Sequence, residues 1–272
     1  MQCDAANPKA HGIVDIWQET LPVRFGAIDK SDRMTLASMF QFFQEAAISH
    51  AENLGVGREE MARTGQVWIL SRMSVQVDRR PSYRESVTVR SWPRGGEKLF
   101  AIRDFDIRDK DDIPVISARS GWIIVDIEKR RPLRPQSVMD TLPQNDGLNA
   151  LTSGPVSLSE RGNLQKAAER KALYTDVDYN GHVNNVSYIK WIEDALDPPL
   201  LEKAGKMRLD INYMNEILGG ETIEVFSAPL DSEENGTAGA AEGAAAGGQA
   251  FAFEGRKTET GQAAFRAELR LM

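Results

Sequence analysis

The feature that most constrains this chain is a succession of predicted elements that occurs twice. Residues 35–55, "TLASMFQFFQEAAISHAENLG", place apolar side chains at three- and four-residue steps, which indicates an amphipathic helix ending at a glycine. Residues 184–196, "NNVSYIKWIEDAL", repeat that spacing after an asparagine able to cap the helix. Strand-like runs follow each helix, namely residues 67–78, 85–92, 98–109 and 115–127, then 206–214, 222–228, 249–258 and 263–272.

The two halves can be laid over each other. A shift of 149 positions pairs Asp29 with Asp178, and a shift of 136 in the later strands pairs Arg80 with Glu216. The agreement in element order and apolar phase predicts an internal duplication. Each half is then an α+β unit in which an antiparallel sheet wraps the apolar stripe of one helix.

The expected domain organisation follows from this duplication. Residues 1–130 form the first unit and residues 165–272 the second, joined by a linker over residues 131–164 that is rich in Pro, Arg, Ser and Asn. Residues 93–97, "PRGGE", are predicted to be a turn between two strands of the first unit. Residues 234–249 are low-complexity Gly and Ala, and we expect a mobile loop there.

Composition limits the classes of function. The chain has 272 residues, is 41% hydrophobic and carries a net charge of −7, which argues against a general nucleic-acid or membrane-surface binder. Its single cysteine, Cys3, cannot form an internal disulfide, so a reducing compartment is expected. No secretory signal and no apolar run of about 18 residues occurs, so neither export nor a membrane span is expected.

Polar residues gather in "DVDYNGHVNN", residues 176–185. If this segment is extended, Asp178, Asn180 and His182 project from one side and form an acid-base and polarising group. Gly181, Asn184 and Asn185 are interpreted as turn and capping residues. The first half keeps Asp29 but has Arg33 where His182 falls, so the second half is predicted to be the catalytic one.

Other chemistries have less support. The histidines His11, His50 and His182 are scattered without ligand spacing, so we expect no metal and interpret His50 as a packed residue. No cofactor is expected, since the chain lacks a glycine-rich phosphate loop. It also lacks a Gly-x-Ser-x-Gly elbow, and Cys3 is far from the predicted site. Water activated by side chains is the expected nucleophile.

The segment "DVDYNGHVNNVSYIKWIEDAL" resembles the active-site segment of the acyl-acyl carrier protein (acyl-ACP) thioesterases of plants and bacteria, and the similarity covers roughly residues 15–228. The resemblance implies a double hotdog fold, two tandem units that each wrap an antiparallel sheet around a long central helix. It also implies hydrolysis of the thioester of fatty acyl-ACP to free fatty acid and ACP, which ends chain elongation. A bacterial cytoplasmic enzyme is expected, with the mature form of a plastid enzyme as the alternative.

The resemblance assigns site residues by position. Asp178, Asn180 and His182 match the family's catalytic Asp, Asn and His, and Glu216 in "YMNEI" matches its later acid. Ile217 stands where plant enzymes carry Cys, so a thiol mechanism is not expected. We expect Glu216 or His182 to be the general base, with Asn180 and a backbone amide around residues 183–185 holding the carbonyl oxygen.

The first half is expected to bind the acyl chain. Its candidate substrate-binding residues are Met39, Phe42, Phe43, Trp68, Ile69 and Met73. Candidate basic residues for the acidic ACP are Arg79, Arg80 and Arg84 with residues 128–135. The chain is expected to be a monomer with an internal pseudo-dimer, or a homodimer.

Two other functions remain open. One is an acyl-CoA thioesterase of the same fold, and the other is a non-enzymatic protein that binds acyl thioesters.

Overall fold

The computed structural model describes residues 12–230 and 248–272. The predictions for Cys3, His11 and nearly all of the low-complexity segment therefore lie outside the described residues. No helix in the described part is long and apolar enough to cross a membrane.

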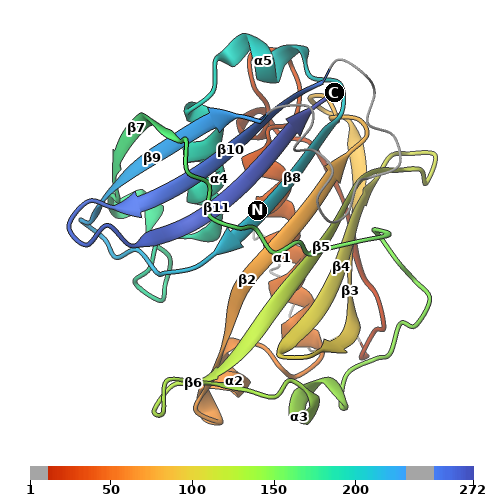
Figure 1. The fold of residues 1–272 in the computed structure, drawn as a ribbon. Helices are drawn as coiled ribbons and strands as arrows, with labels where there is room; N and C mark the ends of the chain where they lie inside the picture. The colour runs from red at the N-terminus through yellow and green to blue at the C-terminus, as the bar shows by residue number, and fades with distance from the viewer. Residues whose placement is uncertain (1–11, 231–247) are drawn as a thin grey trace.

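One antiparallel sheet runs through both halves of the chain (Figure 1). Its strands are β1 (Trp17–Pro22), β2 (Gln66–Val77), β3 (Ser86–Glu97), β4 (Phe100–Arg108), β5 (Pro114–Asp126), β6 (Arg131–Leu133), β7 (Gln165–Lys171), β8 (Met207–Tyr213), β9 (Thr222–Pro229), β10 (Gln249–Lys257) and β11 (Ala263–Leu271). They lie in the order β1-β3-β4-β5-β2-β8-β11-β10-β9-β7, with β6 paired to β5. The second half therefore repeats the strand order of the first in reverse, as a two-fold relationship requires.

The central pair of strands shows this symmetry residue by residue. In β2 and β8, Arg72 lies opposite Asn212, Ser74 opposite Asp210 and Gln76 opposite Arg208. The shift of 136 maps Arg72, Ser74 and Gln76 of β2 onto Arg208, Asp210 and Asn212 of β8. The pair Arg72–Asn212 therefore becomes the pair Arg208–Gln76, and the pair Ser74–Asp210 becomes itself. A pseudo-two-fold axis therefore passes between Ser74 and Asp210, and the predicted α+β duplication is confirmed.

The two long helices are the predicted amphipathic ones. Helix α1 (Leu36–Asn53) begins after Thr35, whose hydroxyl accepts the N–H of Ser38 at 3.1 Å. Helix α4 (Asn185–Asp194) begins after Asn184, whose side chain accepts the N–H of Val186 at 2.9 Å. Both bury their apolar stripes against the sheet in one shared core, and in α1 this stripe includes the predicted packed residue His50.

Some elements differ from the prediction. Residues 93–97 are not a turn, because β3 continues through them with an irregularity near Gly95, and the chain reverses at Lys98 and Leu99. Three short helices were not predicted, since six residues or fewer carry too little periodicity to be recognised. They are α2 (Arg58–Arg63), α3 (Gln136–Met139) and α5 (Pro198–Lys203).

The segment between the halves crosses one face of the sheet. The amide of Ala150 donates to Asp104 Oδ2 at 2.9 Å, and the amide of Leu158 donates to Asn212 Oδ1 at 2.8 Å. This segment thus satisfies polar groups from both halves. The division into residues 1–130, 131–164 and 165–272 stays a prediction, because both halves share a sheet and a core.

Candidate active site

Residues 177–183 form a tight hairpin immediately before α4. Val177 and Val183 form an isolated bridge, and the amide of Asp178 donates to the carbonyl of His182 at 2.8 Å. The amide of Gly181 donates to the carbonyl of Asp178 at 3.0 Å, and Gly181 has a φ of 81°. The expected extended conformation is therefore wrong, because these hydrogen bonds close a turn that a residue with positive φ completes.

The turn changes how the three predicted side chains are arranged. Asp178 Oδ1 accepts the amide of Asn180 at 2.8 Å, so this half-buried carboxylate first stabilises the turn itself. Asn180 is exposed at the tip, and His182 lies half-buried where the chain leaves the turn. The three residues are neighbours through the turn and not through strand alternation.

The turn brings His182 against the residue predicted from the distant strand. His182 pairs with Leu218 in an isolated bridge, and the amide of Val183 donates to the carbonyl of Ile217 at 2.8 Å. These contacts place His182 Nε2 at 3.2 Å from Glu216 Oε2. The side chains of His182 and Glu216 keep 40% and 64% of their exposure, so water reaches the pair.

A buried tyrosine lies beneath this pair. Burial raises the pKa of the Tyr188 hydroxyl, and the nearby carboxylates of Asp178 and Glu216 add to the effect. The hydroxyl of Tyr213 donates to the carbonyl of Asn185 at 3.3 Å. The sequence analysis placed Tyr188 only on the apolar stripe of the helix; a hydroxyl within that stripe was the signal that it also faces polar groups.

The side chain of Ile217 does not open to the site. Ile217 is fully buried in the core and presents only its carbonyl to the turn, through the bond to Val183. Among the residues that the structure describes, the site therefore contains carboxylates, an amide and an imidazole, but no thiol.

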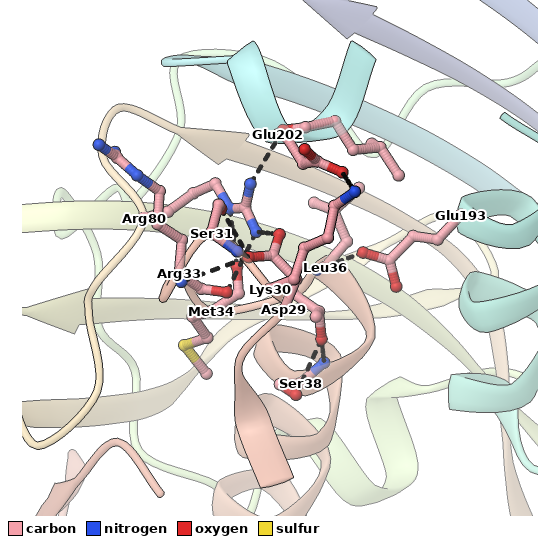
Figure 2. Close-up of polar contacts among 12 residues, drawn as sticks. Asp29, Lys30, Ser31, Arg33, Met34, Leu36, Ser38, Arg80, Glu193 and Glu202 are labelled. Carbon is pink, nitrogen blue, oxygen red and sulfur yellow. Dashed lines mark hydrogen bonds and ion pairs between the residues drawn. The ribbon is translucent and has the colours of Figure 1, made fainter. Parts of the chain in front are cut away.

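The first half has a counterpart of this site that is filled by an ion pair (Figure 2). Asp29 Oδ1 accepts the amide of Ser31 at 2.8 Å. In the second half, Asp178 accepts the amide of Asn180 in the same way. The other oxygen of Asp29 pairs with the guanidinium of Arg80, whose side chain is 2% exposed. Arg80 Nε also donates to the carbonyl of Met34 at 2.8 Å. Arg80 thus occupies the position of Glu216, and a buried ion pair replaces the accessible His182–Glu216 pair.

This burial corrects one prediction about the carrier protein. Arg80 cannot be a surface contact for ACP, because its guanidinium is buried in the chain itself. Arg79 is bound to Glu85 at 2.7 Å, whereas Arg84 is exposed and lies over the ring of Tyr83.

The predicted substrate-binding residues do not line one wall. Met39, Phe43 and Met73 are buried in the main core, and Phe42 packs against it. Trp68 belongs to a separate apolar cluster around Ala101, Met139 and Leu142, whereas Ile69 is 46% exposed.

A buried polar group lies on the inner side of the first half. Arg103 Nη1 donates to Ser91 Oγ at 2.9 Å and to His50 Nδ1 at 3.1 Å. Burial lowers the pKa of Arg103 to about 10 and, with the Arg103 charge, that of His50 to about 4. His50 is therefore neutral and can accept from the guanidinium. Strand alternation along β4 was the signal that Arg103 points inward.

The second half contains a groove of about 460 Å³ where the α4–α5 junction meets β7, β9 and β10. Leu196, Leu200 and Phe251 contribute apolar surface to it. None of the predicted substrate-binding residues lines this groove.

Comparison with known proteins decides the family. The family model described as the acyl-ACP thioesterase N-terminal domain matches residues 15–142, and the one for the C-terminal domain matches residues 160–254. This chain belongs to the acyl-ACP thioesterase family. The resemblance inferred from the motif around His182 is therefore confirmed.

Relatives within this family are distant in sequence. A chloroplastic acyl-[acyl-carrier-protein] hydrolase of Cuphea viscosissima is 25% identical over 235 residues, which cover 80% of this chain and 56% of the relative. A chloroplastic palmitoyl-acyl carrier protein thioesterase of Cuphea hookeriana is 26% identical over 230 residues, which cover 78% of this chain and 54% of the relative. The chain thus spans about half the length of the curated relatives it matches.

Solved structures support the double hotdog fold. The acyl-ACP thioesterase of Bacteroides thetaiotaomicron superposes with a TM-score of 0.77 at 22% identity, covering 95% of this chain and 98% of the other. The 12:0-ACP thioesterase of Umbellularia californica gives a TM-score of 0.76 at 18% identity, covering 95% and 97%. The predicted double hotdog fold is confirmed.

Proposed function

We propose that this chain hydrolyses the thioester of fatty acyl-ACP and releases free fatty acid and ACP. The observation that carries the proposal is the accessible His182–Glu216 pair, 3.2 Å apart, at the start of α4 in one half only. Membership of the acyl-ACP thioesterase family supports the substrate class.

The mechanism begins with activation of a water molecule. Imidazole is the stronger base of the two side-chain types near neutral pH, so His182 takes the proton from water. Glu216 accepts the Nε2–H of His182 and stabilises the positive charge that the ring gains. This arrangement leaves Nδ1 of His182 to accept the proton. When the carbon–sulfur bond of the thioester breaks, His182 returns this proton to the leaving sulfur.

The carbonyl oxygen of the thioester gains negative charge as water attacks. Asn180, exposed at the tip of the turn, and the amide of Asn185 are the groups we assign to holding it. The amides of Val183 and Asn184 already donate to backbone carbonyls. Asp178 keeps the turn closed through the amide of Asn180 and thereby positions that side chain.

The acyl chain is bound by the first half in this proposal. The candidates with accessible surface are Phe42, partly buried beside the core, Trp68, partly buried in the second cluster, and Ile69, which is exposed. Arg84 and the exposed residues 128–132 are the candidate contacts for the acidic carrier protein. One chain already contains both hotdog units, so we propose that a monomer is sufficient.

The test is hydrolysis of matched acyl-ACP and acyl-CoA substrates by the purified chain. We expect release of free fatty acid with a clear preference for acyl-ACP in kcat/KM. A preference for CoA would replace the ACP assignment with an acyl-CoA thioesterase. Tight binding of both substrates without turnover would instead favour a non-enzymatic binding protein.

A further inference from the structure

A carboxylate from the second half closes the start of α1 in the first half. Glu193, near the end of α4, accepts the amide of Leu36 at 2.8 Å and the amide of Ala37 at 3.2 Å (Figure 2). These are among the amides at a helix start that have no partner within the helix. Glu193 therefore occupies the helix start in the first-half counterpart of the active site.

The pseudo-two-fold axis relates this contact to one at the active site. The shift of 149 that pairs Asp29 with Asp178 also pairs Leu36 with Asn185 and Gln44 with Glu193. Since α1 and α4 pack on each other around the axis, the symmetry equivalent of Glu193 on Leu36 is Gln44 on Asn185. By this symmetry, Gln44 is the residue of α1 that corresponds to the start of α4, next to the turn of residues 177–183.

A second pair of contacts supports this placement. In the first half, Lys30 in the turn pairs with Glu202 of α5 at 2.9 Å. In the second half, Tyr179 at the equivalent position lies under the guanidinium of Arg58 of α2, 3.8 Å from the ring centroid. Each turn is therefore contacted by a short helix of the other half, α5 for the first turn and α2 for the second.

Glu193 and Gln44, at the two equivalent positions, differ in the hydrogen bonds that they can form. When ionised, the carboxylate of Glu193 can only accept hydrogen bonds, whereas the carboxamide of Gln44 can both accept hydrogen bonds and donate two. Gln44 is half-buried, and its side chain makes no hydrogen bond to any residue in the described part of the chain. Its donor groups therefore remain available to a substrate.

We propose that Gln44 is a catalytic residue that the first half contributes to the active site of the second. Its Nε2–H donates to the thioester carbonyl oxygen as that oxygen becomes negative. This inference rests on the proposed thioesterase function. It makes the site a composite of both hotdog units, and Gln44 against Glu193 becomes a third difference between the halves, after Arg33 against His182 and Arg80 against Glu216.

Gln44→Ala and Gln44→Glu test the role, with Glu193→Gln as the matched control at the equivalent position. Using acyl-ACP and the full chain, we expect Gln44→Ala to lower kcat about a hundredfold or more with little change in KM, because the lost bond forms in the transition state. Gln44→Glu should lose at least as much, since it removes the donor and adds negative charge. Glu193→Gln should keep kcat within about threefold of the wild type.

The position of Gln44 is tested separately by a crystal structure of the wild-type chain, in which the carboxamide of Gln44 should face the start of α4. The proposal is overturned if the carboxamide points elsewhere, or if folded Gln44→Ala, judged by its melting temperature, keeps wild-type kcat. A wild-type chain inactive on every acyl thioester tried would overturn the proposed function and with it the role of Gln44. An active wild type with unaffected variants would overturn the role alone.

Discussion

His182 Nε2 lies 3.2 Å from Glu216 Oε2, although α4, α5 and β8 separate the two residues along the chain. The bond from the amide of Val183 to the carbonyl of Ile217, one residue beyond each, holds this distance. The backbone thus brings the pair together, and both side chains stay open to water.

The pair should be essential for turnover. We expect His182→Ala and Glu216→Gln each to lower kcat for acyl-ACP about a hundredfold or more, as loss of an acid-base group does. Arg33→Ala is the matched control, because Arg33 is exposed at the equivalent position of the first half. Near-normal turnover in either variant, or an equal loss in Arg33→Ala, would contradict the assignment.

Asp178 should have separable structural and catalytic effects. Asp178→Asn keeps an oxygen that can accept the amide of Asn180, so its melting temperature should stay close to that of the wild type. Asp178→Ala removes this acceptor and should destabilise the turn by about 1 kcal/mol. Kinetics and thermal melts of both variants check this. A fully active Asp178→Asn would limit Asp178 to shaping the turn.

The buried ion pair of the first half should matter for stability and not for chemistry. Arg80→Met leaves the carboxylate of Asp29 without its partner and the carbonyl of Met34 without a donor. We expect a loss of about 3–5 kcal/mol in the free energy of unfolding, measured in urea. The folded variant should keep wild-type kcat, and a large fall in kcat would show that the Asp29–Arg80 pair itself takes part in the reaction.

Glu193 should make the chain less stable as the pH rises. Burial raises the pKa of Glu193 from 4.5 to about 7, against the opposing effect of the amides of Leu36 and Ala37. The folded state then binds more protons than the unfolded state between about pH 4.5 and 7, so stability falls across this range. The unfolding free energy of the wild type relative to Glu193→Gln should decrease by an amount on the order of 3 kcal/mol. A difference in unfolding free energy between the two proteins that does not change with pH would contradict this.

His50 should make the chain more stable as the pH rises. Burial and the charge of Arg103 lower the pKa of His50 from 6.5 to about 4, so the unfolded state binds more protons between these values. Stability relative to His50→Gln should therefore rise with pH between about 4 and 6.5 and level off above it. Denaturant titrations at several pH values measure this slope, and a difference that falls with pH would refute it.

The sequence alone was enough to predict the duplication and the long elements. Apolar spacing over residues 35–55 and 184–196 depends on local geometry, and so does capping by Asn184. The motif around His182 was sufficient to identify the family. Local hydrogen bonding also explains the main error, because the tendency of Asp178 and Gly181 to form a turn outweighed the alternation assumed for an extended segment.

Only the tertiary structure decided which distant residues meet. Sequence comparison paired Arg80 with Glu216, but burial of Arg80 against Asp29 appeared only when the strand and the turn were placed together. The contact of Glu193 with the start of α1 likewise depends on packing between helices of different halves. Spacing along a chain reports which side of its own element a residue occupies, whereas the partner on that side is set by how the two halves pack across the pseudo-two-fold axis.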